Sequence, residues 1–325
     1  MLMKRKKNHI IIPFILLSLL LTLSSAAYSM AEEEIEDQKR SPSSSTSEVL
    51  SEDGSQDKGY FLKVGQDGAE RLEVLNELIN PVSQRFLQKI GLRDDMTILE
   101  LGPGTGHMAV WFAEQVPNGK VIAVDNSPEQ LEIVRSLARA KDIHNIQLIQ
   151  ASAYDLDTLE YQNEIDLIFS RFVFNHLVTP QDVLLSLKKL LKPGATMVIH
   201  DMIARDSLHY PENAVIKEWL DLLFKCYAHY KKDPDIGLKL VSLFKEAGLS
   251  ITDYDYHQPL LKTSHEKLQI KRGVVESRQD LLDQAMISEE TLDTLIHRLG
   301  QLSLDDSLVL SFPANMIVAG KKEGH

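Results

Sequence analysis

The segment 97–111, TILELGPGTGHMAVW, constrains the fold of this chain more than any other stretch. Its apolar start (Ile98, Leu99, Leu101) predicts a buried strand, its spaced glycines predict a tight turn, and the residues after them predict a helix. Glycine allows positive φ and close approach of the backbone to a ligand, and the free N–H groups of such a turn can face an anionic group. The segment therefore predicts a ligand-binding strand, turn and helix.

A second apolar strand follows at a spacing typical of nucleotide binding. The run 121–124, VIAV, ends in Asp125. An acid about 20 residues beyond a glycine turn is placed to bind the two hydroxyl groups of a ribose. The glycine spacing itself differs from the GxGxxG of nicotinamide enzymes, so a different nucleotide-like ligand is indicated.

The motif ELGPGTG, with an acid before its first glycine, resembles motif I of the class I S-adenosylmethionine (SAM) dependent methyltransferases. Further matching segments are VDNSPEQL, FSRFVFNHL and LLKPGATMVIHD. The similarity runs over residues 59–320 and looks most like the members that act on small molecules. It implies SAM as cofactor and transfer of a methyl group to an oxygen, nitrogen or carbon atom of a small-molecule acceptor by in-line displacement.

Short apolar runs alternate with helical patterns through the middle of the chain, which predicts parallel crossover units. Together with the resemblance, this pattern predicts an α/β fold with a doubly wound, mostly parallel, seven-stranded sheet. Two helices, separated at Asn80 and Pro81, are expected before the sheet. The expected later strands are 121–124, 146–149, 165–170, 196–201, 250–256 and one near 315–319.

The segment 257–306 reads mostly as helix and is longer than the hairpin that joins the last two strands in a minimal fold of this type. We hypothesise that it forms, with residues 206–232, a helical lid that sets substrate specificity. The predicted methyltransferase domain, including this lid, spans residues 59–325.

The resemblance also assigns cofactor contacts to residues at the carboxyl ends of the strands, where ligands gather in open α/β sheets. Glu100 would face the ammonium group of SAM and Asp125 its ribose hydroxyls. Ser152 stands where the family commonly has an acid that binds the adenine, so we expect a weaker adenine contact, or one made by the backbone. Ser170 and Arg171 would touch the methionine part, unless they form a strand cap or a structural ion pair. The remaining assigned residues are Gly102, Pro103, Gly104, Gly106, Asn126 and Ala153.

Methyl transfer from a sulfonium needs positioning and exclusion of water more than acid–base chemistry. A base is required only if the acceptor atom carries a proton, and the candidates at strand ends are His176, His200 and Asp201. A lone histidine is more often structural, and Asp201 is equally suited to hold an amine of the substrate. The other histidines lack partners at metal-ligand spacing, so no metal is expected.

The amino terminus predicts a targeting segment. A basic start, the apolar run 10–23 and small residues up to Ala31 follow the order of a secretory signal. At 1.5 Å per residue this run spans roughly 21 Å, short of the ~30 Å hydrocarbon core. A cleaved signal over residues 1–31 is therefore favoured, and an uncleaved anchor through residues 10–27 is the alternative. Residues 32–58, acidic and serine-rich, are expected to be a disordered linker.

A cleaved signal implies a periplasmic or secreted protein, and an uncleaved one implies membrane attachment. Because SAM is made in the cytosol and is charged, an exported enzyme would lack its donor. This consideration keeps a non-catalytic SAM-binding module as an alternative, beside a methyltransferase that acts on protein. The formal net charge of −12 argues against nucleic acid as a partner. Cys226 is the only cysteine, so no intramolecular disulfide can form.

Overall fold

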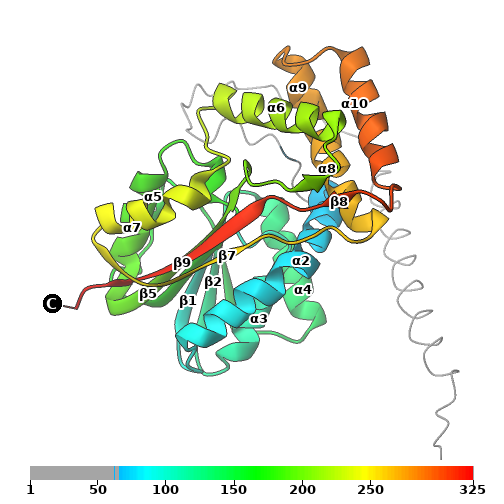
Figure 1. Cartoon of the computed structure of the whole chain (residues 1–325). Coiled ribbons are helices and arrows are strands. Elements are labelled where there is room, and N and C mark those ends of the chain that lie inside the picture. The colour runs from blue at the N-terminus through cyan, green and yellow to red at the C-terminus, as the bar shows by residue number, and fades with distance from the viewer. Residues whose placement is uncertain (1–61, 63–65, 325) are drawn as a thin grey trace, which may run out of the picture. The chain divides into compact units, whose positions relative to one another are not determined.

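The computed structural model describes residue 62 and residues 66–324, all within the compact unit Ser55–His325. The predicted signal or anchor (1–31) and the predicted linker (32–58) lie outside the described residues. The main sheet has seven strands (Figure 1). They are β1 (Thr97–Leu101), β2 (Lys120–Asp125), β3 (Ile146–Gln150), β4 (Ile165–Arg171), β5 (Leu191–Ile203), β7 (Leu249–His257) and β9 (Ala314–Lys322).

The strand order of the sheet is β3-β2-β1-β4-β5-β9-β7. β1 lies parallel to both β2 and β4, whereas β9 is antiparallel to its neighbours β5 and β7. The chain moves outward from β1 to β3 and then returns to start β4 on the other side of β1. The carboxyl ends of β1, β2 and β4 therefore meet where the order reverses, which is where ligands bind in such sheets. The predicted doubly wound, mostly parallel, seven-stranded sheet is confirmed.

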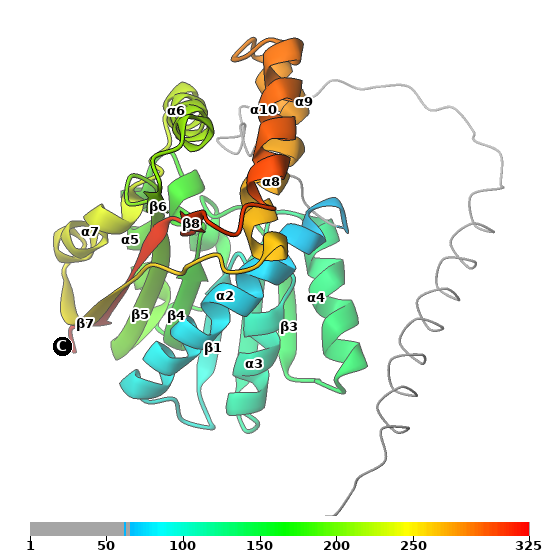
Figure 2. The same ribbon diagram turned by 45° about the vertical axis from the view of Figure 1, so that its right-hand side comes forward.

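Helices cover both faces of the sheet (Figures 1 and 2). α2 (Gln66–Ile90), α3 (His107–Gln115) and α4 (Pro128–Ala140) pack on one face, and α5 (Pro180–Leu190) and α7 (Leu240–Glu246) pack on the other. Within β1, Ile98 packs in the core beneath α2, α3 and α4, whereas Leu99 and Leu101 pack in the core beneath α5 and α7. Because successive side chains of a strand point to opposite faces, Glu100 is directed toward the face that α2 covers.

Among the described residues, one continuous helix precedes the sheet, so the predicted break at Asn80 and Pro81 is wrong. α2 continues through Pro81 because the apolar stripe continues on both sides of it, with Ile79, Val82 and Phe86 all buried. A proline inside a helix costs about 3 kcal/mol. Full burial of one large apolar side chain contributes about 1.5–3 kcal/mol, so several of them outweigh the proline.

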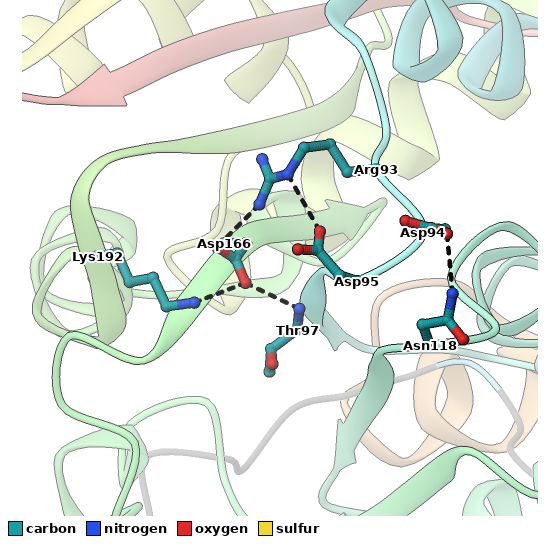
Figure 3. Close-up of polar contacts among 7 residues, drawn as sticks. All are labelled: Arg93, Asp94, Asp95, Thr97, Asn118, Asp166 and Lys192. Carbon is teal, nitrogen blue, oxygen red and sulfur yellow. Dashed lines mark hydrogen bonds and ion pairs between the residues drawn. The ribbon is translucent and has the colours of Figure 1, made fainter.

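Asp166, near the start of β4, holds the amino-terminal ends of the central strands together (Figure 3). Its Oδ2 accepts hydrogen bonds from the Thr97 backbone N–H at 2.9 Å and from Lys192 Nζ at 2.8 Å, and Arg93 forms an ion pair with Oδ1 at 3.5 Å. One carboxylate thus ties β1, β4 and β5 together. These amino-terminal ends lie opposite the carboxyl ends of the strands, where the predicted cofactor residues gather.

The segments predicted as a lid are mostly helical and have a core of their own. They contain α6 (Ala214–His229), α8 (Ser264–Glu276), α9 (Arg278–Asp283) and α10 (Glu289–Leu302). The short strand β6 (His209–Tyr210) belongs to the first of these segments and pairs with β8 (Val309–Leu310), which directly follows the second. The described residues also form three short 3₁₀ helices: η1 (Leu156–Thr158), η2 (Phe174–His176) and η3 (Ile236–Lys239). Within the part of the chain that the structure describes, no helix has the length and apolar character needed to cross a bilayer.

Candidate functional site

A cleft of about 570 Å³ opens at the carboxyl ends of β1, β2, β3 and β4. Ligand sites are typically concavities of about 300–1,000 Å³, so the cleft has the size of a cofactor site. Most of the residues predicted to bind the cofactor line it. These are Glu100, Gly102, Pro103, Gly104, Asp125, Asn126, Ala153 and Arg171.

The turn after β1 has the backbone that only glycine adopts easily. Gly102 has φ of 71°, and a Cβ built on it would stand 2.3 Å from Val173 Cγ2. Gly106 has φ of 83° and caps α3, with Val134 only 3.0 Å from the position of a Cβ. Gly106 does not line the cleft, so its role is to let α3 begin and to pack against α4. The glycine pattern therefore shapes the cleft partly by contact and partly by fixing the helix behind it.

Glu100 is a buried carboxyl without a hydrogen-bond partner for its Oε2 among the described residues. Its side chain is only 3% exposed. Burial raises the pKa of Glu100 to about 8, and nearby Arg171 opposes part of that rise. A buried carboxylate is favourable only when a cation or a donor satisfies it. The ammonium group of SAM would supply both, so Glu100 fits the part predicted for it.

Arg171 lies beside Glu100, where two asparagines of α2 hold its guanidinium. Its Nη1 donates to Asn80 Oδ1 at 2.5 Å and its Nη2 donates to Asn76 Oδ1 at 2.9 Å. Asn76 in turn donates through Nδ2 to Thr105 Oγ1 at 2.8 Å. Burial lowers the pKa of Arg171 to about 10, so the side chain stays charged at neutral pH. The two asparagines, which sequence reasoning missed, stand four residues apart on the buried face of α2, and that spacing was a usable signal.

Asp125 ends β2 and stands at the start of α4. Its Oδ1 accepts a hydrogen bond from the Ser127 backbone N–H at 3.0 Å, and Ser127 caps the helix by accepting from Gln130. Burial raises the pKa of Asp125 to about 6, against the lowering effect of its backbone hydrogen bonds. The carboxylate is therefore held in a fixed orientation while remaining mostly ionised at neutral pH. That arrangement suits a bidentate acceptor for two hydroxyl groups.

Two predicted contacts lie elsewhere. Ser152 does not line the cleft: its Oγ accepts a hydrogen bond from the Tyr154 backbone N–H at 3.2 Å, while Ala153 and Tyr154 form this part of the wall. Ser170 is fully buried and donates to the Leu101 carbonyl oxygen at 3.1 Å, which ties β4 to β1. Ser170 therefore has a structural role at the end of its strand, which was the alternative to a contact with the methionine part of SAM. In both residues a short hydroxyl side chain is satisfied locally, before it reaches a ligand.

The three predicted bases are placed very differently. His200 is fully buried behind the sheet, between Ser83 Oγ at 2.9 Å from its Nδ1 and Asn315 Oδ1 at 2.6 Å from its Nε2. It lines neither the cleft nor a second, apolar cavity that adjoins the cleft between α2, α6 and α8, so its prediction as a base is corrected to a structural role. Burial lowers the pKa of His200 to about 3, which keeps the ring neutral.

Asp201 is also fully buried and lines neither space. Its Oδ2 accepts from the backbone N–H groups of Phe174 (2.8 Å) and Asn175 (3.3 Å), and its Oδ1 accepts from Asn175 Nδ2 (2.7 Å) and the Met202 N–H (2.8 Å). Burial raises the pKa of Asp201 to about 7 against these bonds. Its oxygens are already occupied, so the predicted roles as base or amine-binding group are replaced by that of organising the loop after β4.

His176 is the one predicted base that reaches the ligand space, where it lines both the cleft and the cavity. Its ring stacks on Tyr227 with centroids 6.0 Å apart. Burial, assisted by the positive charges of Lys232 and Arg71, lowers the pKa of His176 to about 3. The imidazole is therefore uncharged at neutral pH and is a weak base.

An apolar cavity of about 150 Å³ adjoins the cleft and lies between α2, α6 and α8. An engineered apolar cavity of this volume binds benzene, so a single ring fits. Arg71, Leu75, Phe172 and His176 border both spaces. The apolar residues contributed by the inserted helices are Trp219, Leu222, Leu223, Cys226, Ile270, Val274 and Leu281. Among the described residues, no cluster of histidine, cysteine and carboxylate side chains is arranged to hold a metal.

The fold and the cleft define an α/β protein that binds a nucleotide-like cofactor at the carboxyl edge of a seven-stranded sheet. The family model described as a methyltransferase domain matches residues 92–292, more than half of the chain. The chain belongs to this family. It is a SAM-dependent methyltransferase, and SAM is its cofactor.

Curated relatives agree with this assignment. The chain is 24% identical over 182 residues to the demethylmenaquinone methyltransferase of Listeria welshimeri, covering 52% of this chain and 76% of the relative. It is 25% identical over 161 residues to the ubiquinone/menaquinone biosynthesis C-methyltransferase of a Shewanella species, covering 47% and 61%. Among solved structures, the YcgJ protein of Bacillus subtilis matches with a TM-score of 0.51 at 20% identity, covering 74% of this chain and 98% of that one. This last likeness concerns the fold.

Proposed function

We propose that this enzyme methylates a small, largely apolar acceptor that carries a ring, held in the cavity beside the cofactor cleft. The observation that carries the proposal is the shared wall: Phe172 and His176 border both the polar cleft and the apolar cavity. A cofactor in one and an acceptor in the other would meet there. The relatives named above, a demethylmenaquinone methyltransferase and a C-methyltransferase of ubiquinone and menaquinone biosynthesis, support the same class of acceptor.

Each part of the protein has a definite task in this proposal. SAM supplies a methyl group on a positively charged sulfur, so no strong base is needed to create the leaving group. Glu100 and Asp125 bind the ammonium and the ribose, and the positive charge of Arg171 favours the ionised form of Glu100 that the ammonium pairs with. The inserted helices α6 and α8 line the cavity with apolar side chains and so exclude water from the reacting atoms. His176, being uncharged, orients the acceptor without repelling the positive sulfur.

The proposal is tested with methyl-labelled SAM and the full chain. A reduced benzoquinone with an unsubstituted ring position, a simple phenol and a mixture of peptides are offered as acceptors, and Asp125→Ala serves as the inactive control. We expect label in a ring-bearing acceptor and none in the control. Label only in the peptides would contradict the proposal and would favour a methyltransferase of proteins.

We further propose that residues 10–27 direct the chain to a membrane, where they are removed as part of a signal or remain as an anchor. The support is the order of basic, apolar and small residues in this segment. Fusion of residues 1–40 to a compartment-sensitive reporter tests this proposal. Reporter activity in the cytosol alone would contradict it.

A further inference from the structure

Gln269, on α8, is a buried polar residue in the wall of the apolar cavity. Its side chain is only 4% exposed, and its neighbours along the wall are Ile270, Gly273 and Val274. A glutamine at such a place carries two donor hydrogens and an acceptor oxygen, all of which need partners. Its hydrogen bonds therefore show what the cavity offers to a ligand.

The amide nitrogen of Gln269 has a partner and the oxygen has none. Nε2 donates to the backbone carbonyl oxygen of Arg71 at 2.5 Å. A carbonyl oxygen can only accept, so this contact fixes which end of the amide is the NH₂ group. Oε1 is buried and has no hydrogen-bond partner among the described residues. A buried acceptor without a donor is unfavourable, and a ligand that brings a donor relieves that cost.

The two helices on either side of the Gln269 amide are held together by a buried ion pair. The Arg71 side chain, directly beside the carbonyl that Gln269 uses, forms an ion pair with Glu276 at 2.8 Å, and both side chains are at most 10% exposed. Arg71 belongs to α2 and Glu276 ends α8, so the pair fastens the two helices on either side of the amide. Oε1 is therefore held in place before a ligand arrives.

The lining of the cavity also restricts the kind of donor. Among the described residues, it contains no aspartate or glutamate, and its one charged side chain is Arg71. A substrate ammonium would find no carboxylate in the wall and would face a positive neighbour. A neutral hydroxyl group meets neither obstacle and can donate one hydrogen bond.

Building on the proposed function, we propose that Gln269 Oε1 accepts a hydrogen bond from a ring hydroxyl of the acceptor substrate and so determines specificity. Gln269 distinguishes hydroxylated rings from bare or alkylated rings of equal size. It does not touch the cofactor cleft, whose lining residues do not include it. Its effect is thus on the acceptor alone.

The test compares two ring probes of similar size, 4-fluorophenol and 4-fluorotoluene, by fluorine NMR titration of the full chain without SAM. In Gln269→Met the side chain keeps its length and loses the amide, that is, both the acceptor oxygen and the donor to the Arg71 carbonyl. We expect the Kd of 4-fluorophenol to rise about tenfold in this variant, as for the loss of one buried hydrogen bond, and the Kd of 4-fluorotoluene to change less than about threefold. Val274→Ala is the matched control on the same wall, and it should weaken both probes by the same factor.

Equal changes for the two probes in Gln269→Met, or no change in either, would overturn the proposal. So would failure of both probes to bind the wild-type chain. If the variant does not fold, the wild type decides alone, because 4-fluorophenol must then bind at least as tightly as 4-fluorotoluene although water solvates it better. Calorimetric titration with SAM separates this outcome from failure of the proposed function: Gln269→Met should bind SAM like the wild type, and absence of SAM binding in the wild type would refute the function and not the role of Gln269.

Discussion

The Tyr227 hydroxyl donates a hydrogen bond to Asn175 Oδ1 at 2.7 Å, which joins helix α6 to the loop after β4. Asn175 passes the connection on through Nδ2 to Asp201 Oδ1, also at 2.7 Å. Helix α6 is thus linked to the centre of the sheet by two consecutive hydrogen bonds. The buried carboxylate of Asp201 therefore supports the wall of the apolar cavity, which Asn175 and Tyr227 line.

This chain of bonds predicts graded losses of stability. Asp201→Ala leaves several buried donors without an acceptor and should lower the free energy of unfolding by about 3 kcal/mol or more. Tyr227→Phe removes one donor and should cost about 1–2 kcal/mol. Urea unfolding measures both, with Tyr254→Phe as a control because Tyr254 is 62% exposed. Equal effects of Tyr227→Phe and Tyr254→Phe would contradict the proposed link.

Three buried carboxyl groups predict how stability depends on pH. Burial raises the pKa of Asp125 to about 6, of Asp201 to about 7 and of Glu100 to about 8 in the folded protein. At these three groups the folded state binds more protons than the unfolded state between about pH 4 and pH 8. His176 and His200, whose pKa burial lowers to about 3, act in the opposite direction below about pH 6.5, because the unfolded chain protonates them there. The free energy of unfolding should therefore fall most clearly between pH 6.5 and pH 8, and Glu100→Gln should flatten this part of the curve. Chemical unfolding of the cofactor-free protein at pH 6.5, 7.2 and 8 tests this; a stability that rises with pH over this range would refute it.

Asp125 should govern the affinity for SAM. Two hydrogen bonds to a charged acceptor contribute about 1.5–3 kcal/mol each, so Asp125→Ala should weaken binding at least about 100-fold. Because the pKa of Asp125 is raised to about 6, wild-type affinity should also decline as the pH falls through 6, when the carboxylate gains a proton. Calorimetric titration at several pH values measures both effects. Unchanged affinity in Asp125→Ala would remove the assigned ribose contact.

Cofactor binding should release a proton from Glu100. With a pKa of about 8, this carboxyl is mostly protonated at pH 7 before binding. A bound ammonium group lowers that pKa, so the proton leaves to the buffer. Titration with SAM in buffers of different ionisation enthalpy should show release of up to about one proton at pH 7, and Glu100→Gln should abolish it. Identical binding heats in all buffers for the wild type would speak against an ammonium at Glu100.

The glycine turn should tolerate no side chain at Gly102. Both its positive φ and the 2.3 Å separation from Val173 oppose a Cβ, so Gly102→Ala should destabilise the fold by about 1–3 kcal/mol and reduce SAM binding. Gly194 is a matched control, with φ of 79° and nothing within 4 Å of its Cβ position. Gly194→Ala should show the backbone strain without the loss of SAM binding. Thermal unfolding and SAM titration of the two variants, side by side, distinguish collision from strain.

The sequence of this chain determined its sheet and the floor of its cofactor cleft. The period of apolar residues defined parallel strands, and the carboxyl ends of such strands must meet, so Glu100, Asp125 and Arg171 could be placed together in advance. Prediction of cofactor contacts from the sequence failed where a side chain could hydrogen-bond to more than one kind of partner. Ser152 and Ser170 carry short hydroxyl groups that backbone groups satisfy nearby, and nothing in the linear sequence ranks those partners above a ligand.

Only the tertiary structure decided what surrounds the cleft and the cavity. Asn76 lines the cleft, and Tyr227 and Gln269 line the cavity. They come from three helices far apart in the sequence and reach these spaces because those helices pack on one another. The burial of His200 likewise depends on Ser83 and Asn315, which come from the two ends of the fold. Strand periodicity is a short-range property and can be read locally, whereas the cavity results from packing between distant segments, which no local pattern specifies.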